Sequence, residues 1–141
     1  MLMSIWAPFA AWCSVAVALL HVYVIVQGPW AYRFFGAGEQ LATMAEQGSW
    51  VPTLLTSGIT IVFFAFAAYY FAAASWIPRL PFFKWALIGI AAVYTLRGAM
   101  VIPALLVGMK ISPFDLWSSL TSLAIGLIHC LAAWQALRRA L

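Results

Sequence analysis

Charged side chains are scarce in this sequence, which has only seven Lys and Arg and three Asp and Glu among 141 residues. A soluble domain carries roughly 25% charged residues, so this chain has too few to cover a water-exposed surface. With 67% of the residues hydrophobic, lipid is expected to surround most of the chain. The basic residues do not cluster on a polar helix or strand, so we expect no nucleic-acid partner.

Patterns typical of catalytic and metal sites are also missing. The sequence has no G-x-S-x-G, no paired carboxylates within an apolar segment, and no E-x-x-H or H-x-x-x-H pair. Cys13 and Cys130 both lie inside apolar runs, where a cysteine usually serves as a small core residue. These absences favour a binding or structural protein over an enzyme and argue against a metal site.

What the sequence does contain is four long apolar segments. Each reaches the length of about 20 residues that an α-helix needs to cross a bilayer. They lie at residues 5–27, 51–75, 82–109 and 116–137. The sequence therefore predicts an all-α, polytopic membrane protein, a four-transmembrane-helix bundle that forms a single integral membrane domain over residues 1–141. Pro103 should kink the third span, and Ser112, Pro113 and Asp115 should cap the fourth helix.

The longest connection, residues 28–50, holds two of the three carboxylates. A GAG turn at residues 36–38 is followed by residues 39–47, which we expect to form a short helix that lies at the interface or re-enters the bundle. The aromatic side chains around Tyr32 should form a belt at the membrane interface. We interpret this loop as a lid over a polar pocket. Its proposed lid residues are Tyr32, Arg33, Glu39 and Glu46.

Basic residues predict the orientation in the membrane. Four of them fall in the loop and tail on the side of the two termini: Arg79, Lys84, Arg138 and Arg139. Only Arg33 and Lys110 fall on the other side. The positive-inside rule therefore places both termini in the cytoplasm and the loop 28–50 outside.

The segment YRFFGAGE at residues 32–39, followed by GSWVPT at 48–53, resembles a motif of small bacterial inner-membrane proteins. The resemblance implies no particular activity.

Arg97 is the strongest functional candidate because it lies near the middle of the third span. A guanidinium at that depth is expected to face protein or a water-filled cavity rather than lipid. A bound anion is one possible partner, Glu39 or Glu46 from the loop is another, and Asp115 is a third. A structural role and a ligand-binding role for Arg97 both remain open.

Other polar side chains concentrate in the outer halves of the spans, below the loop. This bias predicts an outward-facing pocket, and the alternative is close packing of small polar groups without a cavity. The candidate ligand-binding residues are Arg97, His21, Tyr94, Glu39, Thr60, Ser57, Ser122 and His129.

The leading functional hypothesis is that the pocket binds an amphiphilic ligand, such as a lipid or a quinone-like molecule. The alternative is an accessory or homo-oligomeric subunit of a membrane transporter, channel or enzyme complex, with small-residue contacts such as Ala68 and Ala72. Two further alternatives are a haem protein that uses His21 or His129 as axial ligand and an enzyme that modifies lipid head groups with Arg97 and His21.

Overall fold

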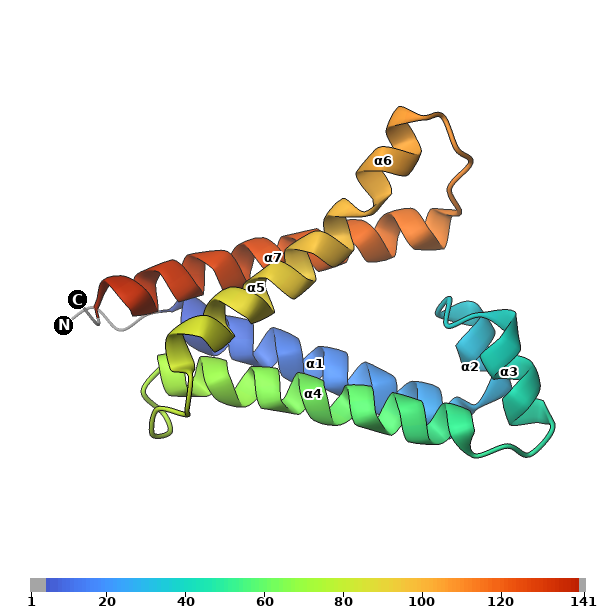
Figure 1. Cartoon of the computed structure of the whole chain (residues 1–141), viewed down its shortest axis with the longest axis horizontal. Helices are drawn as coiled ribbons and strands as arrows, with labels where there is room; N and C mark the ends of the chain where they lie inside the picture. Colours follow the sequence, from blue (N-terminus) through green and yellow to red (C-terminus); the bar gives the residue numbers. More distant parts are fainter. Residues whose placement is uncertain (1–4, 140–141) are drawn as a thin grey trace. The chain divides into compact units, whose positions relative to one another are not determined.

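The computed structural model describes residues 5–139, and within this range it contains helices and no strand (Figure 1). Four stretches are long and apolar enough to cross a membrane, and the third of them is divided into α5 and α6. This confirms the predicted all-α fold with four transmembrane helices. The helices are α1 (Trp6–Gln27), α2 (Pro29–Phe34), α3 (Glu39–Glu46), α4 (Val51–Ala73), α5 (Phe83–Ala99), α6 (Val101–Leu106) and α7 (Pro113–Arg138).

The expected spans differ from the observed helices by only a few residues. The largest shifts are at the end of the third span, where α6 ends at Leu106 rather than at 109, and in the last span, where α7 begins at Pro113 rather than at 116. The predicted cap explains the earlier start, because the Ser112 hydroxyl accepts a hydrogen bond from the Asp115 amide at 3.0 Å and Pro113 opens the helix.

The chain divides into two compact units. One is the segment Ser14–Ala65. The other comprises the chain up to Cys13 and from Phe66 onward. Each is described separately below.

In the unit Ser14–Ala65, α2 and α3 form a small hairpin with its own apolar core. Gly28 at φ +68° and Gly38 at φ +105° provide the sharp turns before the two helices. The buried core residues are Val24, Ala31, Tyr32 and Ala42, with Phe35, Leu41 and Ala45 packed against them. The expected helix at 39–47 is present as α3, whereas α2 was not predicted.

The sequence suggested that Tyr32 belongs to an interfacial aromatic belt. This prediction is wrong, because only 1% of Tyr32 is exposed. Its hydroxyl instead accepts a hydrogen bond from the Thr56 hydroxyl of α4 at 3.4 Å. The reason is the unforeseen helix α2, which turns this side chain inward while Trp30 and Phe34 remain exposed. Tyr32 therefore fixes the hairpin to α4.

A three-residue ion network links α2 to α3. The guanidinium of Arg33 binds Glu39 through Nε, at 2.9 Å to Oε2, and through Nη2, at 2.7 Å to Oε1. It also binds Glu46 through both terminal nitrogens. The two carboxylates that we considered as partners for Arg97 thus bind Arg33 instead. Their hydrogen bonds from Arg33 lower the pKa of both carboxyl groups, and the two carboxylates raise the pKa of Arg33.

The depressed pKa values make the hairpin sensitive to acid. Because the folded-state pKa of each carboxyl lies below the ordinary value of 4.5, its contribution to hairpin stability is complete above pH 4.5 and is lost as the pH falls through the folded-state pKa. NMR titration of the glutamate carboxyl carbons should therefore give midpoints below 4.5, and Arg33→Met should raise them toward that value. Gln40→Met, which changes an exposed neutral side chain of α3, should leave them unchanged. Identical midpoints in wild type and Arg33→Met would contradict the network.

In the other unit, α5 and α7 approach each other closely at two glycines. A Cβ atom on Gly98 would lie 2.6 Å from the Cα of Leu123, and one on Gly126 would lie 2.7 Å from the backbone nitrogen of Thr95. Real side chains do not tolerate such distances, so the two backbones can meet only because both residues lack a side chain. Small residues at the contact are the usual means of close helix packing in membranes.

An aromatic cluster fills the interior of the same unit and joins three helices. The Tyr70 hydroxyl of α4 donates to the carbonyl oxygens of Leu87 in α5 and His129 in α7, at 3.0 and 3.1 Å. The His129 ring lies 4.5 Å from the ring of Tyr70 and 4.5 Å from that of Tyr94. Both Tyr70 and His129 are fully buried. The cluster therefore fixes α4, α5 and α7 to one another.

The third span is broken where proline removes a backbone donor. Helix α5 ends at Ala99, whose carbonyl would accept from the amide of residue 103 in a continuous helix, and Pro103 has no amide proton. After Met100 the chain continues as α6, which turns away from α7 (Figure 1). The kink predicted at Pro103 is thus present, and it separates α6 from the helix pair.

Candidate functional site

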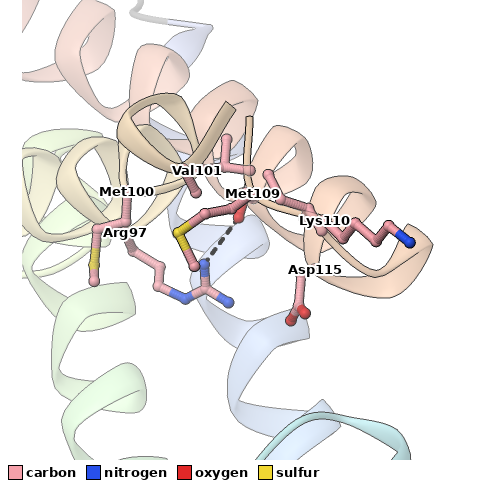
Figure 2. A pocket seen from close by; sticks show the side chains of 9 residues that line it. Arg97, Met100, Val101, Met109, Lys110 and Asp115 are labelled. Atoms are coloured by element: carbon pink, nitrogen blue, oxygen red, sulfur yellow. Dashed lines mark hydrogen bonds between the residues drawn. The ribbon is translucent and has the colours of Figure 1, made fainter. Parts of the chain in front are cut away.

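A pocket of about 230 Å³ lies where α6 diverges from α7 (Figure 2). One wall comes from the end of α5 and from α6, and the other from the α6–α7 loop and the first turns of α7. Its lining residues are Arg97, Met100, Val101, Ala104, Met109, Lys110, Ile111, Asp115 and Ser119. The break at Pro103 and the cap at Ser112 therefore shape a cavity at one end of the α5–α7 pair.

Arg97 is held in this pocket by neutral partners. Its Nη1 donates to the Ser119 hydroxyl at 3.1 Å, the bond drawn dashed in Figure 2, and its Nη2 donates to the Ser118 hydroxyl at 3.5 Å. Within residues 5–139 both ion pairs belong to Arg33, so Arg97 has no carboxylate partner in this part of the chain. The serines orient the guanidinium, but its positive charge is not neutralised by them.

Asp115 carries the opposite charge in the same pocket. Its Oδ2 accepts from the Ser112 hydroxyl at 2.7 Å, and the carboxylate forms no ion pair within the described residues. Figure 2 shows the Arg97 guanidinium and the Asp115 carboxylate on the same side of the pocket, whereas the Lys110 ammonium points away from Arg97. The pocket thus presents a cation and an anion that do not bind each other.

Only Arg97, among the residues proposed from the sequence, lines this pocket. Tyr94, Ser122 and His129 lie together in the α5–α7 interior, where the Ser122 hydroxyl donates to the Tyr94 carbonyl at 3.0 Å. These residues stabilise the contact between α5, which carries Arg97, and α7, and they do not line the cavity.

The remaining proposed residues belong to the unit Ser14–Ala65. The Thr60 hydroxyl donates to the Thr56 carbonyl one turn earlier, at 2.8 Å. The Nδ1 of His21 lies 2.7 Å from the Val17 carbonyl, and the His21 ring contacts Phe63 at 5.0 Å between centroids. Ser57 is half-buried on α4, and Glu39 binds Arg33.

The histidines each use Nδ1 in a local hydrogen bond. Nδ1 of His129 lies 2.8 Å from the Ile125 carbonyl oxygen, and Nδ1 of His21 lies 2.7 Å from the Val17 carbonyl oxygen. Because a carbonyl oxygen can only accept a hydrogen bond, Nδ1 carries the proton in both rings. Across residues 5–139 no three His, Cys, Asp or Glu side chains are grouped in a way that could hold a metal ion.

Eight of the nine pocket residues were not proposed as site residues from the sequence, and those with polar or charged side chains are Lys110, Asp115 and Ser119. Asp115 was assigned to the helix cap and considered as one possible partner of Arg97, and it serves both as cap and as pocket wall. One feature of the sequence could have indicated these residues. Pro103 kinks one span and Asp115 belongs to the cap at the start of the next, a combination that indicates two helix ends that diverge around polar groups. The pairing of Ser119 with Arg97 depends on the register of α5 against α7, which a single sequence does not display.

These features define the chain as a multi-pass α-helical membrane protein with a charged pocket at one end of a close-packed helix pair. Comparison with protein-family models, with curated proteins and with solved structures found no match to this chain. The resemblance of residues 32–39 to a bacterial inner-membrane motif therefore gains no support from these comparisons.

Proposed function

We propose that the protein binds the head group of an amphiphilic, phosphate-bearing lipid in the pocket between α5, α6 and α7. The observation that carries this proposal is Arg97, which falls within the third apolar span, is oriented by two serines and has no carboxylate partner in the described chain. Uncompensated charge at such a depth is costly. The phosphate of a lipid head group would remove that cost, and the planar fork of arginine matches phosphate oxygens.

The size of the pocket supports a head group rather than a whole ligand. A volume of 230 Å³ is below the roughly 300–1,000 Å³ of sites that enclose a drug-sized molecule. It would hold on the order of eight waters at about 30 Å³ each. A lipid can place its polar end there while its chains remain in the surrounding bilayer.

The apolar part of the lining suits the rest of such a ligand. Met100, Val101 and Ala104 form the wall on the side of α5 and α6. Beyond them, Leu105 and Leu106 of α6 are 52% and 81% exposed, as expected of side chains that contact acyl chains. Charge at one end and apolar surface at the other is the pattern that an amphiphile complements.

Native mass spectrometry of the detergent-purified chain tests the proposal. Wild type should retain one lipid, and Arg97→Gln should bind it about ten- to a hundredfold more weakly, since a hydrogen bond to a charged group contributes about 1.5–3 kcal/mol. Arg97→Lys keeps the charge without the fork and should fall between them. Thermal unfolding of each variant shows whether it remains folded.

Arg79→Gln is the matched control. Arg79 carries the same charge in the same unit, but it lies in the α4–α5 loop with its guanidinium 5.3 Å from the Phe83 ring. Equal lipid retention by Arg97→Gln and Arg79→Gln would contradict the proposal. Bare wild-type protein in a fixed multimer would contradict it as well and would favour the accessory or homo-oligomeric subunit.

A further inference from the structure

The pocket holds two opposite charges that do not form an ion pair with each other. Arg97 is fixed by Ser119 and Ser118, while Asp115 is fixed by Ser112. Both line the same cavity and face its same side in Figure 2. Both side chains are exposed, Asp115 in the first turn of α7, so both are accessible to a ligand. Their separate anchoring indicates a site built for a ligand that contacts both.

A purely anionic head group fits this arrangement poorly. Its phosphate would be attracted to Arg97, but the carboxylate of Asp115 would repel it and would keep an unneutralised charge of its own. The Lys110 ammonium does not offset this repulsion inside the pocket, since it points away from Arg97 (Figure 2). The pocket is therefore not a generic anion site.

Within the proposed lipid-binding function, on which this inference rests, we infer that the ligand is a zwitterionic phospholipid of the phosphoethanolamine type. Its phosphate would accept hydrogen bonds from Arg97, and its primary ammonium would donate to Asp115. The available carboxylate oxygen is Oδ1, because Oδ2 already accepts from Ser112 at 2.7 Å. Each of these two charges would then gain a partner of opposite sign.

Titration of the delipidated full-length protein with two lipids of identical acyl chains tests this assignment by native mass spectrometry. Phosphatidylethanolamine should bind about tenfold more tightly than phosphatidylglycerol, as one charge-assisted hydrogen bond would give. In Asp115→Asn the ratio should fall to about one. The variant keeps the helix cap, since the Ser112 hydroxyl accepts from the backbone amide of residue 115. Asp115→Glu keeps the charge and should preserve the preference.

The outcomes of this titration distinguish the phosphoethanolamine assignment from the proposed lipid binding. Binding of both lipids with equal affinity by wild type, or an unchanged ratio in Asp115→Asn, would overturn the zwitterion assignment and leave lipid binding in place. If Asp115 only stabilises the start of α7, Asp115→Asn will alter thermal unfolding without altering the ratio. Absence of binding by either lipid would overturn both proposals. Soluble glycerophosphoethanolamine that binds as tightly as the lipid would identify a water-soluble zwitterion and overturn the lipid assignment.

Discussion

Gly98→Ala is expected to destabilise the α5–α7 pair although it adds a single methyl group. The new Cβ would lie 2.6 Å from the Leu123 Cα and 2.7 Å from its Cβ, and a backbone cannot rotate away as a side-chain tip can. Overpacking of this kind costs about 1–3 kcal/mol. Alanine recovers up to about 1 kcal/mol of helix propensity over glycine, which leaves a net loss where the helices cannot separate.

Gly89→Ala on the same helix is the matched control. No heavy atom lies within 4 Å of a Cβ built on Gly89, so only the gain in helix propensity applies. Titration with a denaturing detergent should place the midpoint for Gly98→Ala below wild type and that for Gly89→Ala at or above it. Gly126→Ala should follow Gly98→Ala, because its Cβ would lie 2.7 Å from the Thr95 backbone nitrogen. Equal midpoints for Gly98→Ala and Gly89→Ala would mean that α5 and α7 are not in close contact at Gly98.

Tyr70→Ala should cause the largest loss of stability in the same unit. Tyr70 is fully buried and contacts α5 through Leu87 and α7 through His129. Truncation of a buried aromatic ring costs about 3–5 kcal/mol, because the cavity that remains is only partly filled by relaxation. Thermal unfolding followed by circular dichroism measures the loss.

Tyr70→Phe separates the ring from the hydroxyl. The carbonyl groups of Leu87 and His129 lie inside helices and keep their helical hydrogen bonds, so loss of the hydroxyl should cost only about 0.5–1.5 kcal/mol. Trp85→Ala, at an aromatic residue that is 71% exposed, should change stability by about 0.5 kcal/mol or less. A Tyr70→Ala protein as stable as Trp85→Ala would contradict the described cluster.

The spans could be predicted from the sequence because length and apolar composition are local properties. The cap of α7 was predictable for the same reason, as Ser112, Pro113 and Asp115 act within one turn. Helix α2 was not foreseen, because a Gly-Pro pair such as Gly28 and Pro29 usually marks the end of a helix, whereas Pro29 here also opens the next helix. That error placed Tyr32 at the interface instead of in the core.

The candidate site could be predicted only in part. Arg97 stood out because a charge inside an apolar span is rare, and it does line the pocket. The hydrogen-bond partners of Arg97 could not be predicted from the sequence. Pairing of Arg97 with Ser119, and of Glu39 with Arg33, depends on helix register and on a hairpin, both of which are properties of three-dimensional packing. Polar residues in neighbouring spans therefore suggested one shared pocket, whereas Thr60 and His21 bond to carbonyls one turn away.

Photo-crosslinking locates the ligand and so tests the central claim most directly. A phosphatidylethanolamine with a photoreactive group near its head would be incorporated into membranes that contain the full-length protein, and the adducts would be mapped by peptide mass spectrometry. Lipid binding at the pocket predicts that adducts concentrate in residues 97–119 and are lost in Arg97→Gln but kept in Arg79→Gln. Adducts spread evenly along the exposed faces of all four spans, and unchanged by Arg97→Gln, would contradict it.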